Sequence, residues 1–232
     1  MTPLSHNEQI LQMEDECEIV IANTSELLAE CCRLRHQVFC LETEIFKPAN
    51  GNQETDDFDK HARHVLLIHR KSGQPIGTTR VIAPSERLSV DRFPMTRAFA
   101  PGILSTLPAH STGEISRFAI SKDYRMKCGA NMMIRLGLMQ GIVRLSGELG
   151  LTHWCAIMEP KLVRLFQMKG IDFHELGPAV EYFGWRLPVY ADITMLSKLL
   201  KANCWDVWNY VSLGGTLWNE NRMQRVRQLE FA

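Results

Sequence analysis

Residues 113–120 read Gly-Glu-Ile-Ser-Arg-Phe-Ala-Ile and place two opposite charges inside an otherwise apolar run. A β-strand here has two faces, one with Glu114, Ser116 and Phe118 and the other with Ile115, Arg117 and Ala119. Burying a carboxylate or a guanidinium is costly unless the group is paired or used. Two interpretations are open at this point: an ordinary ion pair at the edge of a strand, and two groups of a functional site.

The residues that follow form a basic turn that leads into a long apolar helix. They read Ser-Lys-Asp-Tyr-Arg-Met-Lys-Cys-Gly-Ala over positions 121–130. The N-terminus of a helix attracts anions because its backbone amides and its dipole point toward them. A charged strand that ends at such a turn therefore indicates a place for an anionic or thioester-bearing ligand.

The composition is that of an ordinary globular protein. Of the 232 residues, 45% are hydrophobic and 22% charged, and Lys plus Arg equal Asp plus Glu at 26 each. These values argue against wholesale disorder and against bulk attraction to nucleic acid or membranes, so a charged partner would have to bind a local patch. The seven cysteines are odd in number and have no Cys-x-x-Cys spacing, which favours buried reduced thiols over disulfides or zinc. With no signal-peptide pattern and no window of about 18 apolar residues, we expect a soluble cytoplasmic protein without a membrane span.

Hydrophobic periodicity predicts the order β-α-loop-β-β-loop-β-α-β-α-β-β. The predicted strands are 16–23, 62–69, 75–84, 114–120, 152–158, 171–176 and 186–193, and the predicted helices are 25–39, 129–149 and 160–169. The connection 85–112 is too long for a plain loop, so we expect short helices in it. The order predicts an α/β protein with a mixed sheet of about seven strands and helices on both faces. Residues 1–193 would form one domain and residues 194–232 a C-terminal helical extension.

Charged side chains in the apolar strands need partners. Arg80 lies inside the strand 75–84 and Arg117 inside the next one, and an unpaired buried guanidinium is prohibitive. The loop 41–60 carries the acidic run with Asp56 and Asp59 and is the obvious source of carboxylates. Such a network suits a reaction in which an amine is held, deprotonated and kept from bulk water.

Five short motifs in a fixed order resemble the signature of the acyl-homoserine-lactone synthases and the related N-acyl amino acid synthases. They are Arg35-His36-Gln37-Val38-Phe39, Glu54-x-Asp56-x-Phe58-Asp59, Arg80-Val81-Ile82-Ala83-Pro84, Phe93-Pro94 and Glu114-Ile115-Ser116-Arg117-Phe118. The resemblance covers about residues 16–193. Tyr124-Arg125 and the segment 181–188 look closest to the acyltransferases associated with PEP-CTERM/exosortase systems.

The resemblance implies a GNAT-type fold and transfer of a fatty acyl group from a thioester to an amino group. It implies a network of six residues: Arg35, Asp56, Asp59, Arg80, Glu114 and Arg117. Phe39 and Phe93 are their apolar companions, and Glu114 is the candidate base because amine attack requires a neutral nitrogen. Ser116, Phe118, Ala119 and Ile120 would contact substrate, and backbone amides around 118–120 would stabilise the oxyanion. We expect a bulge in this strand, with Glu114 facing the acceptor and Arg117 anchoring the acidic loop.

The acyl donor would be a phosphopantetheine thioester, with no bound cofactor or metal. Donor contacts are expected at Lys122, Arg125, Lys127, Gly129 and Ala130, and the basic members would bind an acidic acyl carrier protein. Cys128 stands where the GNAT pyrophosphate turn has glycine, which favours a carrier protein over coenzyme A. The lactone synthases carry a Trp where this chain has Ile45 and Phe46, which questions a lactone-forming acceptor.

Other readings remain open from the sequence. Lys122 and Arg125 could equally belong to a solvated basic face, and methionines on the helix 129–149 are more often core than acyl tunnel. The spacing of His61, His64 and His69 does not fit a metal site. Besides an N-acyltransferase acting on an amino acid or small amine, the sequence allows a coenzyme A-dependent GNAT enzyme and a non-catalytic acyl-thioester-binding module. The acceptor, the chain length and the oligomeric state are not predicted.

Overall fold

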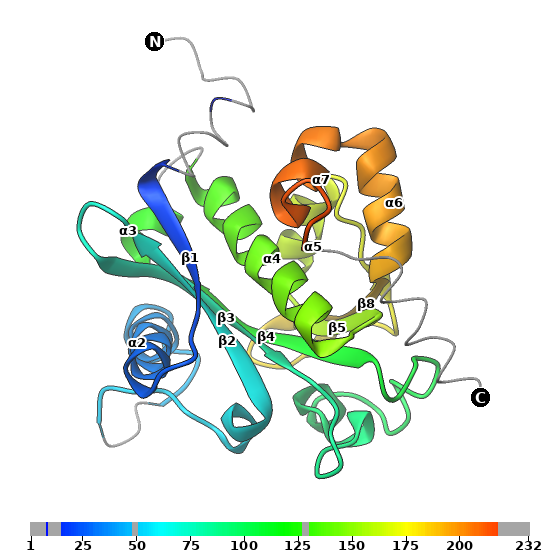
Figure 1. Ribbon diagram of the computed structural model, residues 1–232. Coiled ribbons are helices and arrows are strands. Elements are labelled where there is room, and N and C mark those ends of the chain that lie inside the picture. The colour runs from blue at the N-terminus through cyan, green and yellow to red at the C-terminus, as the bar shows by residue number, and fades with distance from the viewer. Residues whose placement is uncertain (1–7, 9–14, 48–50, 127–129, 218–232) are drawn as a thin grey trace. The chain divides into compact units, whose positions relative to one another are not determined.

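The first strand and helix follow the polarity pattern of the sequence. In the computed structural model, which describes residues 8, 15–47, 51–126 and 130–217, strand β1 spans Cys17–Ile21 and helix α2 spans Ser25–His36 (Figure 1). Thr24 caps α2 because its side-chain oxygen accepts a hydrogen bond from the backbone N–H of Leu27 at 3.3 Å. The predicted strand and helix are thus confirmed.

The end of this helix differs from the prediction. A helix was expected to residue 39, but α2 gives way to a π-helix, η1, over Gln37–Glu42. The wider turn is closed by the backbone N–H of Thr43, which bonds the carbonyl of Val38 five residues earlier at 3.0 Å. Apolar spacing alone does not separate this geometry from an α-helix.

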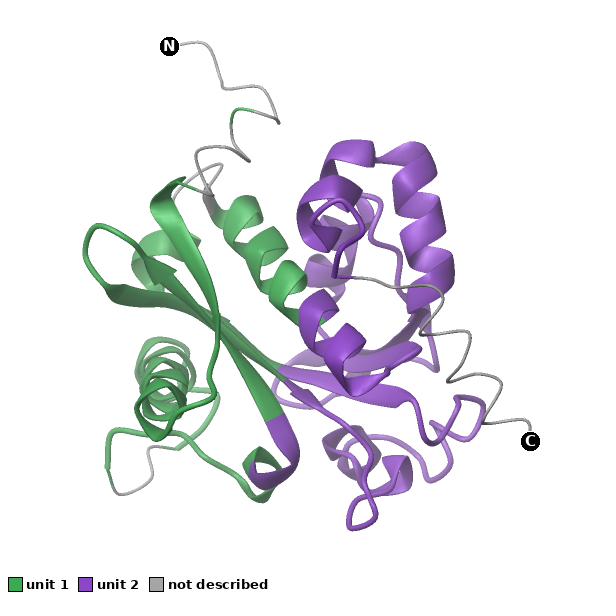
Figure 2. Ribbon diagram, viewed as in Figure 1, with its two compact units in different colours: residues 1–59, 63–80, 117–142 green, residues 60–62, 81–116, 143–232 purple. Residues whose placement is uncertain are grey.

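The chain divides into two compact units (Figure 2). The first comprises residues 1–59, 63–80 and 117–142. Its strands follow the order β1-β2-β3-β4, where β2 is Ala62–His69, β3 is Gln74–Ile82 and β4 is Thr112–Ile120. β1 and β2 are antiparallel, with Cys17 opposite His69 and Ile21 opposite Val65. Gly73, with φ of +67°, makes the turn between β2 and β3.

Helices lie on both faces of the sheet in this first unit. Helix α4, Ala130–Leu149, packs directly on the sheet: a β-carbon at Gly77 would lie 3.3 Å from Leu138, and one at Gly141 would collide with Val65. The next residue in β3, Thr78, points the other way and contacts Cys31 of α2. Because neighbouring strand residues point to opposite faces, α2 and α4 cover opposite sides. The short helix α3, Lys122–Arg125, precedes α4.

The second unit comprises residues 60–62, 81–116 and 143–232. Its strands follow the order β4-β5-β8-β6, with β5 at His153–Met158, β8 at Trp185–Asp192 and β6 at His174–Glu175. β5 runs parallel to β4 and antiparallel to β8, which also pairs with the short β7, Val180–Glu181. This confirms the expected mixed sheet. The strand predicted at 171–176 shrinks to two residues because Gly170, at φ +75°, and Gly177-Pro178 bend the chain on either side.

Short helices complete the second unit. The long connection after β3 holds two 3-10 helices, η3 at Val90–Arg92 and η4 at Pro94–Arg97, as expected. Helices α5 (Pro160–Gln167), α6 (Ile193–Asn203) and α7 (Trp205–Ser212) follow. The core of this unit includes Trp154, whose indole N–H donates to Ser146 at 2.8 Å. The proposed division at residue 193 stays a prediction.

Within the described ranges, the helices are all too short or too polar to cross a membrane.

Candidate active site

Strand β4, Thr112–Ile120, has an unusual backbone conformation at Arg117. This residue has φ of +55°, in the left-handed region that costs a side-chain-bearing residue about 1–2 kcal/mol. Regular pairing of β4 with β5 covers Thr112–Ile115 and stops before this point. The strand is therefore irregular after Ile115, within the stretch from Glu114 to Arg117 where the sequence predicts a bulge. Strong bonds are needed to hold Arg117 in this conformation.

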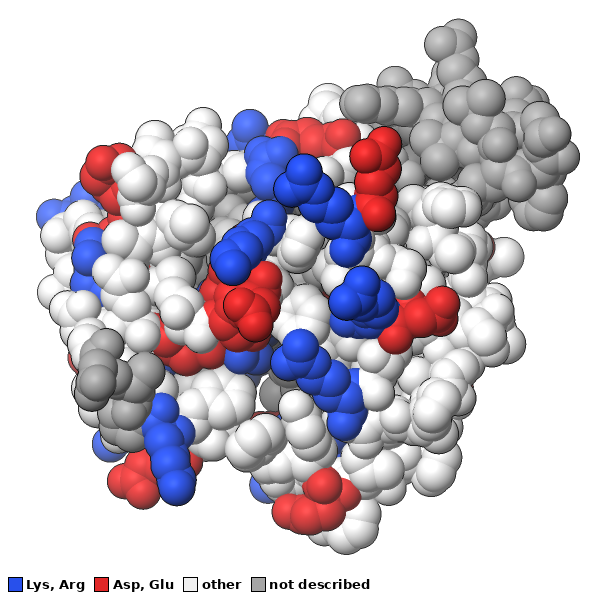
Figure 3. All heavy atoms as spheres, turned by 90° about the horizontal axis from the view of Figure 1, so that it is seen from below, with Lys and Arg blue, Asp and Glu red and all other residues white. Residues whose placement is uncertain are grey.

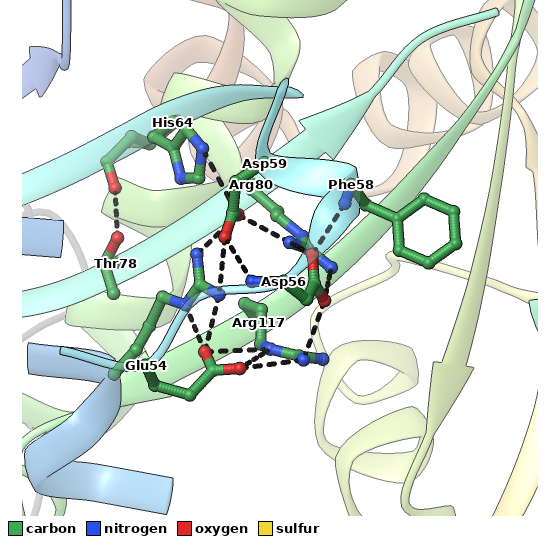
Figure 4. A network of polar contacts seen from close by, with 10 residues as sticks. Glu54, Asp56, Phe58, Asp59, His64, Thr78, Arg80 and Arg117 are labelled. Carbon is green, nitrogen blue, oxygen red and sulfur yellow. Dashed lines mark hydrogen bonds and ion pairs between the residues drawn. The ribbon is translucent and has the colours of Figure 1, made fainter. Parts of the chain in front are cut away.

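Three arginines and three carboxylates of the first unit supply those bonds (Figure 4). They form a closed ring of hydrogen-bonded ion pairs, which we call the ion ring. Each carboxylate accepts hydrogen bonds from two arginines, and each arginine donates to two carboxylates. The ring runs Arg35, Glu54, Arg117, Asp56, Arg80, Asp59 and back to Arg35. Five of its six members, all except Glu54, are among the network residues predicted from the sequence, and Arg117 is the residue expected to anchor the acidic loop.

The bonds of the ring are short and several are bidentate. Arg35 donates to Glu54 at 2.5 Å and to both oxygens of Asp59 at 2.7 and 3.2 Å. Arg80 donates to the two oxygens of Asp56 at 2.6 and 2.8 Å and to Asp59 at 2.5 Å. Arg117 reaches Glu54 at 3.0 Å and Asp56 at 2.9 Å. Paired hydrogen bonds between a guanidinium and a carboxylate hold both groups in one geometry and stabilise their charged forms.

The ring is buried and balanced. Arg35 and Arg80 are 0% exposed, while the side chain of Arg117 is 19% exposed. Three positive and three negative groups leave no net charge, which is the condition under which buried ions are tolerated. Removing one member would leave a buried charge without its counterion.

The arginines keep the carboxylates ionised. Burial, the largest single influence, would raise the pKa of Asp59, but hydrogen bonds and charge from Arg35 and then Arg80 outweigh it and hold that pKa well below 3.8. The same balance lowers the pKa values of Glu54, through Arg117 and Arg35, and of Asp56, through Arg80 and Arg117. The ring carboxylates therefore act as fixed negative charges at neutral pH.

The acidic loop has its own local geometry. The backbone N–H of Phe58 donates to the side chain of Asp56 at 2.9 Å, and the N–H of Asp56 donates to Asp59 at 2.8 Å. These bonds form a turn that continues into the 3-10 helix η2, Asp57–His61. The ring of Phe58 is buried and points away from the network (Figure 4). Side chain and backbone together aim the two aspartates at the arginines.

Two aromatic side chains, Phe46 and Phe39, lie beside the ion ring. The guanidinium carbon of Arg117 is 4.7 Å from the centre of the Phe46 ring, a cation–π distance. Phe46 meets Phe39 edge-on at 5.7 Å, and Phe39 packs on the buried cluster of Leu34, Val38 and Ala119. The π-helix that carries Phe39 is thus coupled to Arg117 through two aromatic rings.

Glu114 belongs to the second unit and is 1% exposed. One carboxylate oxygen accepts a hydrogen bond from the backbone N–H of Met95, in η4, at 2.9 Å. Phe93, just before that helix, is 0% exposed. The 85–112 connection therefore fixes the candidate base, a role that residue patterns in this segment did not predict. The charge of Glu114, after burial, also contributes to the raised pKa of the Cys155 thiol.

The remaining predicted residues lie on β4 and after it. Ser116 and Phe118 are half-buried, and Ala119 and Ile120 are buried. Arg125 donates to Glu42 at 3.0 Å, and the backbone N–H of Lys122 donates to the same carboxylate at 3.2 Å. Lys127, Cys128 and Gly129 lie outside the described residues, and Ala130 begins α4. Acidic side chains lie among the basic ones on the face drawn in Figure 3.

Several neighbours of the site were not predicted as site residues. Glu54 was quoted only as part of a motif, although its spacing from Asp56 and Asp59 could have placed it in the network. His64, 3% exposed, lies with its Nε2 3.7 Å from Asp59, and burial lowers its pKa to about 4. The position of His64 on an apolar strand next to the acidic loop could have indicated that it lies beside the site. The pairing of Glu42 with Arg125 joins residues 83 positions apart, which a single sequence does not reveal.

Comparison with known proteins finds similarity to acyltransferases. Residues 34–135 match the family model described as Acetyltransferase (GNAT) domain. An acyl-homoserine-lactone synthase of Vibrio anguillarum is 22% identical over 147 residues, 62% of this chain and 74% of that protein. One of Ralstonia nicotianae is 28% identical over 169 residues, 70% of this chain and 79% of that protein. The chain is an acyltransferase with a GNAT-like fold, and it is similar to acyl-homoserine-lactone synthases.

Solved structures show the same acyltransferase fold. FeeM, an N-acyl amino acid synthase from uncultured soil microbes, superposes with a TM-score of 0.62 at 14% identity, over 80% of this chain and 96% of that one. BjaI, a CoA-dependent acyl-homoserine lactone synthase solved with SAM and isopentyl-CoA, gives 0.56 at 21% identity, over 81% and 88%. The GNAT-like fold expected for this acyltransferase is thereby confirmed.

Proposed function

We propose that this acyltransferase moves a fatty acyl group from an acyl thioester to the amino group of an amino acid or a related small amine. The observation that carries the proposal is strand β4. It holds a buried carboxylate, Glu114, three residues before Arg117, whose strained backbone is fixed by the ion ring. A simple binding module has no use for a buried, positioned carboxylate of this kind.

The proposed reaction is direct attack without a covalent enzyme intermediate. The neutral amine nitrogen attacks the thioester carbonyl carbon, and its proton passes to Glu114, directly or through one water. The tetrahedral intermediate then expels the thiolate, which takes up the proton to give the free thiol and an amide product. Backbone amides around residues 118–120 are the proposed donors to the oxyanion. The bond from Met95 holds the Glu114 carboxylate in one orientation during these steps.

We propose that the ion ring holds strand β4 in position and does not exchange protons with the substrate. Its carboxylates are matched by guanidinium groups and their pKa values are low, so they are poor bases. Arg35, Asp56, Asp59, Arg80 and Arg117 would instead fix the shape of β4 beside the acceptor. A displacement of the reacting groups by about 1 Å can cost a factor of 100 in rate, which is what a rigid ring prevents.

Acyl carrier protein is the preferred donor, because the sequence has Cys128 where the GNAT pyrophosphate motif has glycine. Coenzyme A is the alternative, since BjaI is described as CoA-dependent. A free amino acid is the preferred acceptor, since Phe46 stands where the lactone synthases carry Trp. The resemblance of residues 181–188 and of Tyr124-Arg125 to the PEP-CTERM/exosortase-associated acyltransferases supports a role in that branch, and we propose that the reaction takes place in the cytoplasm.

A direct product assay tests this proposal. The full chain is incubated with a long-chain acyl group on acyl carrier protein or on coenzyme A, together with pooled amino acids or S-adenosylmethionine. Mass spectrometry then detects N-acyl products. We expect N-acyl amino acids, formed faster from the carrier protein. A lactone product would identify S-adenosylmethionine as the acceptor in place of an amino acid. A faster reaction from coenzyme A would identify coenzyme A as the preferred donor. If neither donor is consumed with any acceptor, the proposed function is wrong.

A further inference from the structure

A largely shielded ion pair of the first unit joins the π-helix η1 to the short helix α3. Nη2 of Arg125, the last residue of α3, donates to the carboxylate of Glu42, the last residue of η1, at 3.0 Å. The side chain of Glu42 is 10% exposed and that of Arg125 is 29% exposed. Hydrogen bonds shielded from water in this way are stronger than those of a pair on the open surface.

Three donors fix the Glu42 carboxylate. One oxygen accepts from the side-chain amide of Gln37 at 2.7 Å and from the backbone N–H of Lys122 at 3.2 Å, and the other accepts from Arg125. Lys122 and Arg125 are the first and last residues of α3. Glu42 therefore holds both ends of this helix against η1.

The guanidinium of Arg125 keeps donors for a ligand. Its bond to Glu42 uses Nη2, and among the described residues Nε and Nη1 have no hydrogen-bond partner. The backbone of Arg125 is fixed as well, since its carbonyl accepts from the side chain of Asn131 in α4 at 2.7 Å. A guanidinium held in place with nitrogens still open is suited to bind phosphate oxygens.

The same π-helix also reaches the ion ring. Phe39, three residues before Glu42, meets Phe46 edge-on at 5.7 Å, and Phe46 lies 4.7 Å from the guanidinium carbon of Arg117. Helix η1 is thus in contact with Arg125 through Glu42 and with Arg117 through two aromatic rings. π-Helical turns are found mostly at functional sites, and these contacts give this one a use.

We propose that Glu42 is a positioning residue for the acyl donor. It holds Arg125 where the guanidinium binds the phosphate of a phosphopantetheine arm, which acyl carrier protein and coenzyme A share. Without Glu42 the long Arg125 side chain must be ordered when the donor binds, and this cost weakens the affinity. The inference rests on the proposed function, because it concerns the donor of that reaction.

Isothermal titration calorimetry with the full chain tests this role without turnover. The probe is an acyl-phosphopantetheine with a long acyl chain, in which a thioether replaces the thioester and prevents transfer. Glu42→Asp keeps the negative charge but shortens the side chain, so the bond to Arg125 is lost. We expect about 10-fold weaker binding, because a charge-assisted hydrogen bond that orders the arginine is removed. The same probe without its phosphate should bind wild type and variant equally.

Matched variants separate positioning from a general effect on folding. Glu44→Asp makes the same change at an exposed residue two positions later and should bind like wild type. In an Arg125→Gln background, Glu42→Asp should change the affinity by less than about twofold, because Glu42 acts through Arg125. Glu42→Gln is the second variant and should also weaken binding. Thermal unfolding checks that each variant is folded.

Two further measurements connect binding to the reaction and to the donor. In the product assay, Glu42→Asp should raise the KM for the donor about 10-fold and leave kcat and the KM for the amine within about twofold. Thioether analogues of acyl-coenzyme A and of acyl carrier protein carry the same phosphate. The one that wild type binds more tightly identifies the source of that phosphate.

Several results would overturn the proposal. They are unchanged or tighter binding of the phosphorylated probe to folded Glu42→Asp, equal weakening with and without the phosphate, and a full effect of Glu42→Asp in the Arg125→Gln background. A wild-type chain that does not bind the phosphorylated probe would overturn it as well. If wild type binds the probe but forms no product with any acceptor, only the proposed function is wrong, and the comparison of affinities still decides the role of Glu42.

Discussion

Replacing Asp59 with Asn removes one negative charge from the ion ring while keeping the shape of the side chain. Asp59 accepts bonds from Arg35 at 2.7 and 3.2 Å, from Arg80 at 2.5 Å and from the backbone of Asp56 at 2.8 Å. The variant leaves one uncompensated positive charge between two arginines that are 0% exposed. Breaking a buried ion pair on one side costs about 3–5 kcal/mol, and we expect a loss in this range for Asp59→Asn at pH 7.

Urea unfolding followed by circular dichroism measures this loss of free energy. The matched control is Glu30→Gln, which breaks the exposed helical pair of Glu30 with Arg33 and should cost about 0.5 kcal/mol or less. The pKa of Asp59 is lowered in the folded protein, so its stabilisation is present above the ordinary value of 3.8 and is lost as the pH falls below it. The difference between wild type and Asp59→Asn should therefore shrink at acid pH. A cost below about 1 kcal/mol at pH 7 would refute the buried ring as a source of stability.

Three further changes test other parts of the structure. Gly141→Ala should cost about 1–3 kcal/mol in chemical unfolding, because the added methyl group meets Val65 where α4 touches the sheet. His64 is buried, and its pKa of about 4 should be seen when the side chain is titrated by NMR; a pKa of 6.5 would contradict its burial in a neutral form. Because the folded protein resists protonation of His64, the free energy of unfolding should fall by about 3 kcal/mol as the pH is lowered from 6.5 to 4. His64→Leu should remove this part of the pH dependence of stability. Thr24→Ala removes the cap of α2 and should lower the unfolding free energy by about 1 kcal/mol; no change would mean that the cap is not formed in solution.

Much of the fold could be predicted because local patterns agree with tertiary packing. The Asn-Thr-Ser signal before α2, the hairpin turn at Gly73 and the long apolar run of α4 each specify one local structure. The π-helix η1 was missed because one extra residue in a turn hardly changes apolar spacing. The two-residue strands β6 and β7 were misjudged or missed because such short pairings depend on β8 rather than on their own residues.

The candidate site was predictable where charge conflicts with burial. Arg80 and Arg117 in apolar strands required carboxylates, and the acidic loop was the nearest source in the sequence. The closed ring could not be predicted, since the role of Glu54 depends on the distance between Arg35 and Arg117 in the folded chain. The same holds for the contact of Phe46 with Arg117 and for the bond from Met95 to Glu114. These contacts join segments that no periodicity relates.

The most direct test of the proposed mechanism is the turnover of Glu114→Gln in the product assay. Gln keeps an oxygen that can accept the bond from Met95 but cannot take a proton from the amine, so folding should persist. The matched control is Glu175→Gln, an exposed residue on β6. We predict that kcat falls about 100- to 10,000-fold for Glu114→Gln and is unchanged for the control. Wild-type turnover in folded Glu114→Gln would contradict the assignment of Glu114 as the base.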